Sequence, residues 1–166
     1  MLEQPSAKTL VLGVGNLLMC DEGVGVHVVR RLANTHHFPM EEVLILDGGT
    51  LGMDLLYYLQ GIENLLIVDA VDAGQEPGGV IRLEGEQVPS FLSMKISPHQ
   101  IGIPDMLFAA KLTECYPSNV VLWGVQPERM EIGLEMSSTV ASQVDDLVQH
   151  LVDQLNEWGH SPLSLD

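Results

Sequence analysis

Short apolar runs that end in glycine or in an acidic residue recur along the chain. Four of them are almost continuous in apolar residues and predict strands buried on both faces: Thr9–Val14, Val43–Leu46, Leu65–Val68 and Val120–Val125. The run Gly79–Leu83 alternates more with polar residues and predicts a fifth strand at an edge. Unbroken apolar strands are typical of a parallel sheet that is covered on both faces.

Segments with apolar residues at helical spacing separate these strands. They predict helices over Glu22–Ala33, with Asp21 as its N-cap, over Leu51–Gln60, and over Pro104–Tyr116, with proline in its first turn. The last helix is the clearest, because one apolar stripe runs along it and Gly159 ends it. Its stripe consists of Val140, Val144, Leu147, Leu151, Leu155 and Trp158.

Strands that alternate with helices predict an α/β fold. We expect a mostly parallel five-stranded sheet with helices on both faces. A length of 166 residues suits a single domain over residues 1–166, with a core of about residues 9–158. The sequence contains no repeat, linker or low-complexity tract that would divide it.

The charge balance limits the partners. Seven basic and 23 acidic residues give a net charge of −16, and no Lys or Arg follows Arg129. We therefore expect no binding to nucleic acid or to an anionic membrane surface, and a basic, neutral or metal-carrying partner. No apolar run is long enough to span a membrane or resembles a secretory signal. Cys20 and Cys115 cannot build a disulfide framework, which predicts free thiols in a reducing cytoplasm.

Acidic residues lie at or just beyond the carboxyl ends of three predicted strands. They are Glu22, Asp47 and Asp69. Because the carboxyl ends of parallel strands share one edge, where open α/β sheets place ligands, these acids can converge on a site. The alternative is that each acid caps a turn or helix, and for Asp47, followed by Gly-Gly-Thr, that interpretation is favoured.

His99 is the histidine placed best for chemistry. It lies in a loop between the strand Gly79–Leu83 and the helix Pro104–Tyr116, where a surface or capping role is the ordinary alternative. Together with two acids it forms a two-carboxylate, one-imidazole set that suits a divalent ion and leaves coordination positions open. The remaining histidines considered, His36, His37, His150 and His160, are expected to be solvated.

Several familiar catalytic motifs are missing, including H-E-x-x-H, G-x-S-x-G and the P-loop. Gly13-Val-Gly15 begins like a dinucleotide-binding fingerprint, but Leu18 occupies the third glycine position. A tight turn explains the two glycines equally well, and acids beside the loop would repel phosphate. A nucleotide-binding domain is therefore the weakest of the hypotheses.

Four motifs in order strongly resemble the hydrogenase maturation endopeptidases, which process the large subunit of [NiFe] hydrogenases. The motifs are G-V-G-N-L-L-M-C-D-E-G-V-G from Gly13, D-G-G-T from Asp47, V-D-A from Val68 and K-I-S-P-H-Q from Lys95. The resemblance runs from about Thr9 to the last helix. The family fold, a twisted sheet flanked by helices, agrees with the predicted one.

The resemblance implies a metal-dependent endopeptidase. Glu22, Asp69 and His99 match the residues that contact metal and serve catalysis, and Asp47, Gly48, Gly49 and Thr50 match a motif that lines the substrate cleft. The implied reaction removes the C-terminal extension of a hydrogenase large-subunit precursor after nickel insertion. Nickel presented by the precursor is the expected metal, and zinc or cadmium from a crystallisation buffer could take its place.

Two further expectations concern this site. Without a metal, the carboxylates of Glu22 and Asp69 should repel each other, which would raise the pKa of one of them. The alternative function is a non-catalytic, nickel-checking or chaperone module in hydrogenase assembly, in which the same residues bind the metal and another protein cuts.

Overall fold

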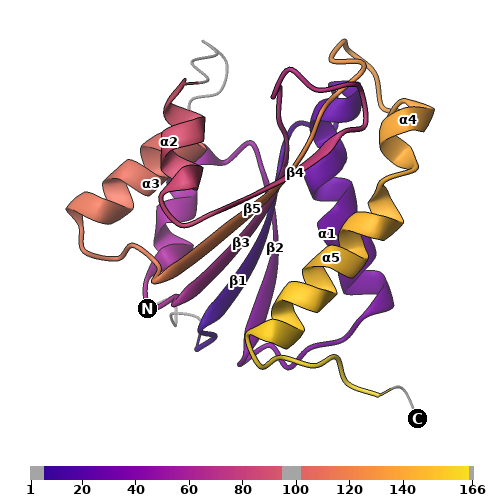
Figure 1. Cartoon of the computed structure of the whole chain (residues 1–166). Coiled ribbons are helices and arrows are strands. Elements are labelled where there is room, and N and C mark those ends of the chain that lie inside the picture. The colour runs from indigo at the N-terminus through magenta and orange to yellow at the C-terminus, as the bar shows by residue number, and fades with distance from the viewer. Residues whose placement is uncertain (1–5, 95–101, 165–166) are drawn as a thin grey trace.

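A five-stranded sheet with the strand order β2-β1-β3-β5-β4 forms the centre of the molecule (Figure 1). The computed structural model describes residues 6–94 and 102–164. Strands β2, β1, β3 and β5 are parallel, and β4 runs antiparallel to β5. The strands are β1 (Thr9–Val14), β2 (Val43–Gly49), β3 (Asn64–Ala70), β4 (Val80–Glu84) and β5 (Asn119–Val125).

Helices cover both faces of this sheet (Figure 1). On one face, α1 (Val24–Thr35) and α5 (Val144–Glu157) enclose an apolar cluster with alternate strand residues such as Val11 and Leu66. On the other face, the 3-10 helix η2 (Gly52–Leu59), α2 (Gln87–Met94) and α3 (Ile103–Leu112) enclose a second cluster. The predicted α/β architecture is confirmed.

The strands lie at the predicted positions, but the burial of one of them, β2, differs from the prediction. β4 is an edge strand, as its polar alternation predicted. The prediction that Val43–Leu46 is buried on both faces is wrong, because β2 forms the other edge of the sheet. Val43 is buried, whereas Leu44, Ile45 and Leu46 keep partial exposure.

The helices differ from prediction mainly at their ends. A short 3-10 turn, η1 (Cys20–Gly23), precedes α1, and Asp21 does not cap the helix as predicted. α3 ends at Leu112 rather than Tyr116, and Glu114 has a positive φ of 57° just beyond it. The segment 51–60 forms a 3-10 helix, and α2 had no clear apolar period to predict it.

The last helix packs as its stripe predicted. Leu147, Leu151 and Leu155 are fully buried in the cluster shared with α1 and the sheet. Val140 belongs to a separate short helix, α4 (Ser138–Ala141). Gly159, with a φ of +90°, follows the end of α5, and that left-handed conformation explains the glycine there.

Glycines bring the start of α1 close to the sheet. A Cβ atom added to Gly25 would collide with the carbonyl oxygens of Val68 and Val14, and one added to Gly13 would collide with the carbonyl of Gly25. Gly13, the first glycine of the G-x-G pair, and Gly25 therefore serve close backbone packing. This contact fixes the connection between β1 and α1, in which Glu22 lies.

Two other predictions can be compared with the described residues. Cys20, which is buried, and Cys115, which is partly buried, are both free thiols, as predicted. Within residues 6–94 and 102–164, no helix has the length and apolar character needed to cross a membrane.

Candidate functional site

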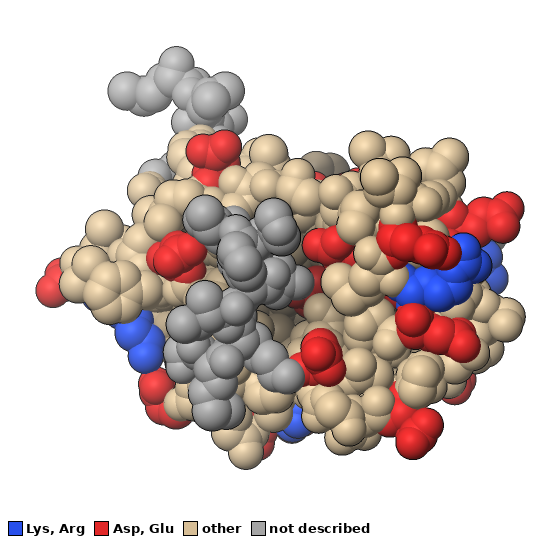
Figure 2. Space-filling model, turned by 90° about the horizontal axis from the view of Figure 1, so that it is seen from above, with Lys and Arg blue, Asp and Glu red and all other residues tan. Residues whose placement is uncertain are grey.

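The parallel strands place their following loops at one edge of the sheet, called here the carboxyl edge. Figure 2 looks down onto this edge and shows acidic side chains spread over it, with the largest group of basic atoms at one margin. Glu22 on η1 and Asp69 near the end of β3 both belong to this edge. β1 and β3 are hydrogen-bonded neighbours in the sheet, so these two acids lie at or just beyond the ends of adjacent strands.

Glu22 and Asp69 form an electrostatically coupled pair. Burial raises the pKa of the Asp69 carboxyl well above its usual range, the backbone N–H of Ala70 counteracts part of this rise, and repulsion from Glu22 adds to it. The repulsion from Glu22 places these two acids near each other, and the direction of the pKa shift is the one expected from the sequence, whereas their role as metal ligands stays a prediction. Burial contributes more to that rise than the repulsion does.

Asp47 does not join this pair. It is in register with Gly13 and hence with Val68, whose side chain lies on the α1 face of the sheet. Asp69 is one residue further along, and strand alternation directs it to the opposite face, with Leu65 and Ile67. The prediction that all three acids converge is therefore wrong for Asp47.

The side chain of Asp47 instead has local partners. Arg30 on α1 donates to its Oδ2 from Nη2 at 2.7 Å and from Nε at 2.9 Å. The backbone N–H of Gly49 donates to its Oδ1 at 3.1 Å, which is the turn role favoured from the sequence. The substrate-binding role of Asp47, Gly48, Gly49 and Thr50 stays a prediction.

Asp21 has a structural role that the sequence did not predict. Its carboxylate is fully buried and accepts four hydrogen bonds, from the N–H groups of Glu128, Arg129 and Ser137 and from the Ser137 hydroxyl. Burial alone would raise the pKa of Asp21, but these hydrogen bonds together lower it below its usual value. Asp21 thus stays ionised and fastens the segment 128–137 to η1.

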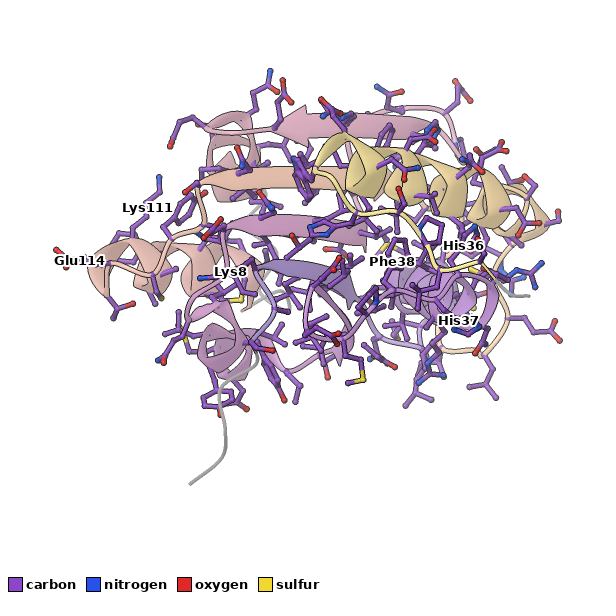
Figure 3. The ribbon with its side chains drawn as sticks, turned by 90° about the horizontal axis from the view of Figure 1, so that it is seen from below. Lys8, His36, His37, Phe38, Lys111 and Glu114 are labelled. Atoms are coloured by element: carbon purple, nitrogen blue, oxygen red, sulfur yellow. The ribbon has the colours of Figure 1, made fainter. Side chains whose placement is uncertain are left out.

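The histidines outside the site are less uniform than predicted. His37 is exposed, and His36 shares a hydrogen bond with the hydroxyl of Thr35. The two histidines lie beyond the C-terminal end of α1, away from the carboxyl edge (Figure 3). His150 stacks on Trp123, with ring centroids 4.3 Å apart. His160 bonds Thr9 at 2.9 Å and is largely buried. The prediction that His150 and His160 are solvated is therefore wrong.

The third predicted metal ligand, His99, lies outside the described residues. Among residues 6–94 and 102–164, no three His, Cys, Asp or Glu side chains are grouped to hold a metal ion. The described part of the site is thus the Glu22 and Asp69 pair. Two close carboxylates, one of them with a raised pKa, are a donor set that a divalent cation stabilises.

Comparisons with known proteins identify the family. The model of the HycI hydrogenase maturation protease family matches residues 26–154. The hydrogenase 2 maturation protease of Escherichia coli K12 is 39% identical over 153 residues, which cover 92% of this chain and 93% of that protein. The hydrogenase expression/formation protein HupD of Rhodobacter capsulatus is 42% identical over 154 residues, covering 92% of this chain and 73% of that protein.

Solved structures show the same similarity. The hydrogenase maturating endopeptidase HybD from E. coli has a TM-score of 0.89 at 38% identity, over 94% of this chain and 96% of that one. The [NiFe] hydrogenase maturation protease HybD from Thermococcus kodakarensis has a TM-score of 0.73 at 28% identity, over 89% of this chain and 98% of that one. The chain therefore belongs to the hydrogenase maturation proteases, a family of hydrolases that act in the processing of hydrogenase precursors.

Proposed function

We propose that this protein is an endopeptidase that removes the C-terminal extension of a [NiFe] hydrogenase large-subunit precursor after nickel insertion. The observation that carries the proposal is the coupled pair of Glu22 and Asp69 at the carboxyl edge, with the pKa of Asp69 raised by burial and by Glu22. A cation between the two carboxylates would remove their repulsion. The nickel of the precursor is the cation proposed.

Glu22, Asp69 and His99 are the residues proposed to contact that metal. His99 follows α2 and precedes α3 in the chain, and both helices pack on the face of the sheet to which Asp69 belongs. Two carboxylates and one imidazole bind borderline divalent ions and leave positions open for substrate or water. A metal held there would polarise the scissile carbonyl or lower the pKa of a water molecule.

The residues from Asp47 to Thr50 are proposed to contact the substrate beside this site. They occupy the carboxyl end of β2, next to β1 in the sheet. Arg30 holds the Asp47 carboxylate at 2.7 Å, so Asp47 would meet a substrate as part of an ion pair. We propose that the protein works on its precursor in the cytoplasm, since both cysteines are free thiols.

The test incubates the purified protein with nickel-loaded and nickel-free precursor and follows the shortened subunit by mass spectrometry. The wild type should cut only the nickel-loaded form, and Glu22→Gln, Asp69→Asn and His99→Ala should each abolish cutting. His37→Ala, at an exposed position away from the carboxyl edge, is the matched control and should cut normally.

The same experiment addresses the non-catalytic alternative. If the wild type binds nickel-loaded precursor without shortening it, the protein is a nickel-checking module and the endopeptidase proposal is wrong. Normal cutting by His99→Ala would instead remove His99 from the site. Calorimetry with Zn²⁺ measures metal binding separately from cleavage, and its affinity should fall as pH falls because the ligands take up protons.

A further inference from the structure

Large apolar side chains gather beside the candidate site on two segments that are far apart in the sequence. Ile132 is 88% exposed and Leu134 is 71% exposed, and both belong to the segment between β5 and α4. Leu18, which is 61% exposed, belongs to the connection between β1 and η1. We call these three residues the apolar edge patch.

Backbone hydrogen bonds hold the two segments together. The N–H of Cys20 donates to the carbonyl of Gly133 at 2.9 Å, and the N–H of Gly133 donates to the carbonyl of Leu18 at 2.9 Å. Met19 and Gly133 thereby form a parallel bridge. These bonds place Leu18 next to the stretch from Ile132 to Leu134, and all three side chains are largely exposed.

The patch is a fixed part of the carboxyl edge. The Asp21 carboxylate binds both ends of the segment 128–137, through Glu128 and Arg129 at one end and Ser137 at the other. The N–H of Asp21 also donates to the carbonyl of Arg129 at 3.0 Å. Asp21 directly precedes Glu22, so these bonds fasten the segment that carries the patch to η1, the turn on which Glu22 lies.

The charges around the patch limit what can cover it. The segment carries Glu128, Glu131 and Glu135, and its single cation, Arg129, is paired with Glu131 at 2.8 Å. A second copy of this chain, which also carries a net charge of −16, would be repelled. A polypeptide with apolar side chains and neighbouring basic side chains is complementary to such a surface.

We propose that the apolar edge patch is the surface on which the hydrogenase large-subunit precursor docks, with apolar and basic side chains of the precursor that lie next to the bond to be cut. This inference rests on the proposed function, because the polypeptide that enters the site is taken to be the one that covers the adjoining patch. Apolar side chains at the centre of an interface carry much of its binding energy.

The test compares two double variants. Ile132→Ser with Leu134→Ser removes most of the patch, whereas Phe108→Ser with Leu112→Ser removes two side chains of similar size and exposure on α3. Both should melt within a few degrees of the wild type, because all four side chains are exposed. The patch variant should need at least about tenfold more nickel-loaded precursor for half-maximal cutting, with little change in the maximal rate. The α3 variant should behave like the wild type.

Direct binding of nickel-loaded precursor to the immobilised protein separates this inference from the proposed function. If the wild type does not cut but binds, and only the patch variant loses binding, the docking surface stands and the endopeptidase proposal fails. If the wild type cuts and the patch variant binds and cuts equally well, the docking inference is overturned alone. A wild type that is dimeric by light scattering, with a monomeric patch variant, would also overturn it, since a second copy would then cover the patch.

Discussion

The carboxylate of Asp21 accepts a 2.7 Å hydrogen bond from the backbone N–H of Ser137, which lies 116 residues further along the chain. The hydroxyl of Ser137 also donates to Asp21, at 2.9 Å, and caps α4 through the N–H of Val140. One buried side chain therefore connects the first turn after β1 with the segment that follows β5. The arrangement of the carboxyl edge depends on this connection.

Asp21→Ala should lower the free energy of unfolding by about 2–4 kcal/mol, because it leaves buried N–H donors without an acceptor. Urea denaturation at neutral pH measures the change. The control is Glu41→Ala, since Glu41 is exposed and should contribute less than about 0.5 kcal/mol. A loss of under about 1 kcal/mol for Asp21→Ala would mean that water can replace the four hydrogen bonds.

Gly25→Ala should prevent close packing of α1 on the sheet. The added methyl group would collide with the backbone carbonyls of Val68 and Val14, which cannot move without distorting β3 and β1. We expect a loss of about 3 kcal/mol or more, or a failure to fold, although alanine favours helices. Asn34→Ala, exposed on the same helix, should instead have a neutral or slightly stabilising effect in thermal melts.

Leu151→Asp should destabilise the protein by several kcal/mol, because Leu151 is fully buried between α5 and its neighbours. The introduced carboxylate would lie among the apolar side chains of this cluster, which offer neither charge nor hydrogen bonds to compensate for its burial. Asn156→Asp places the same charge at an exposed position of α5 and should change stability by only a few tenths of a kcal/mol. Equal denaturation midpoints for the two variants would contradict the burial of this helix.

The sequence predicted the features that depend on local pattern. The apolar runs located β1, β3 and β5, and the stripe through Leu147, Leu151 and Leu155 located α5. β2 was predicted as buried because Val43–Leu46 is as apolar as an inner strand, and a run of residues does not reveal its place in the sheet. α2, with Pro89 inside it and no clear apolar period, had no signal of this kind.

Site residues were predictable where a strand end fixed their position. Asp69 lies at the end of β3 and Glu22 follows β1, the parallel neighbour of β3, so their proximity depends on topology alone. Asp47 and Asp69 lie on opposite faces of the sheet because their positions differ by one residue in register, and the sequence alone does not reveal that register. The role of Asp21 could not be predicted, because its partners at 128–137 have no pattern that pairs them with it.

The pH dependence of stability should include a contribution from His27 on α1. Burial lowers the pKa of His27 and the Arg30 charge lowers it further, and its Nε2 is buried without a hydrogen-bond partner. The unfolded chain therefore takes up the proton at higher pH than the folded one. Above the unfolded pKa of about 6.5 His27 is neutral in both states, and its protonation does not affect stability. As pH falls below that value the unfolded chain is protonated first, so the free energy of unfolding decreases until the folded pKa is passed.

When the pH is lowered from about 7.5 to about 5.5, the free energy of unfolding of His27→Phe should accordingly fall less than that of the wild type. The measurement is the urea midpoint at each pH. His37→Phe is the control and should follow the wild-type curve, because the His37 ring is solvated in both states. Parallel curves for the wild type and His27→Phe would mean that the His27 ring is protonated equally in the folded and unfolded chains.

Asp69→Asn should raise stability while removing function. At neutral pH the folded protein must hold the Asp69 carboxyl in a partly buried position beside Glu22, and both desolvation and repulsion disfavour its charge. Asparagine removes the charge at nearly the same size, and its side-chain oxygen can still accept from the N–H of Ala70. We expect the free energy of unfolding to rise by about 1 kcal/mol at pH 7, within the range typical of stabilising changes at strained functional sites.

The gain should shrink as pH falls, because the wild-type carboxyl then becomes neutral in both the folded and the unfolded chain. Denaturant curves at pH 7 and near pH 4 measure both effects, and Asp72→Asn, at an exposed position three residues beyond, is the control. A loss of stability at pH 7 would mean that the carboxylate is stabilised where it lies, and the argument that a cation is needed between Glu22 and Asp69 would then fail.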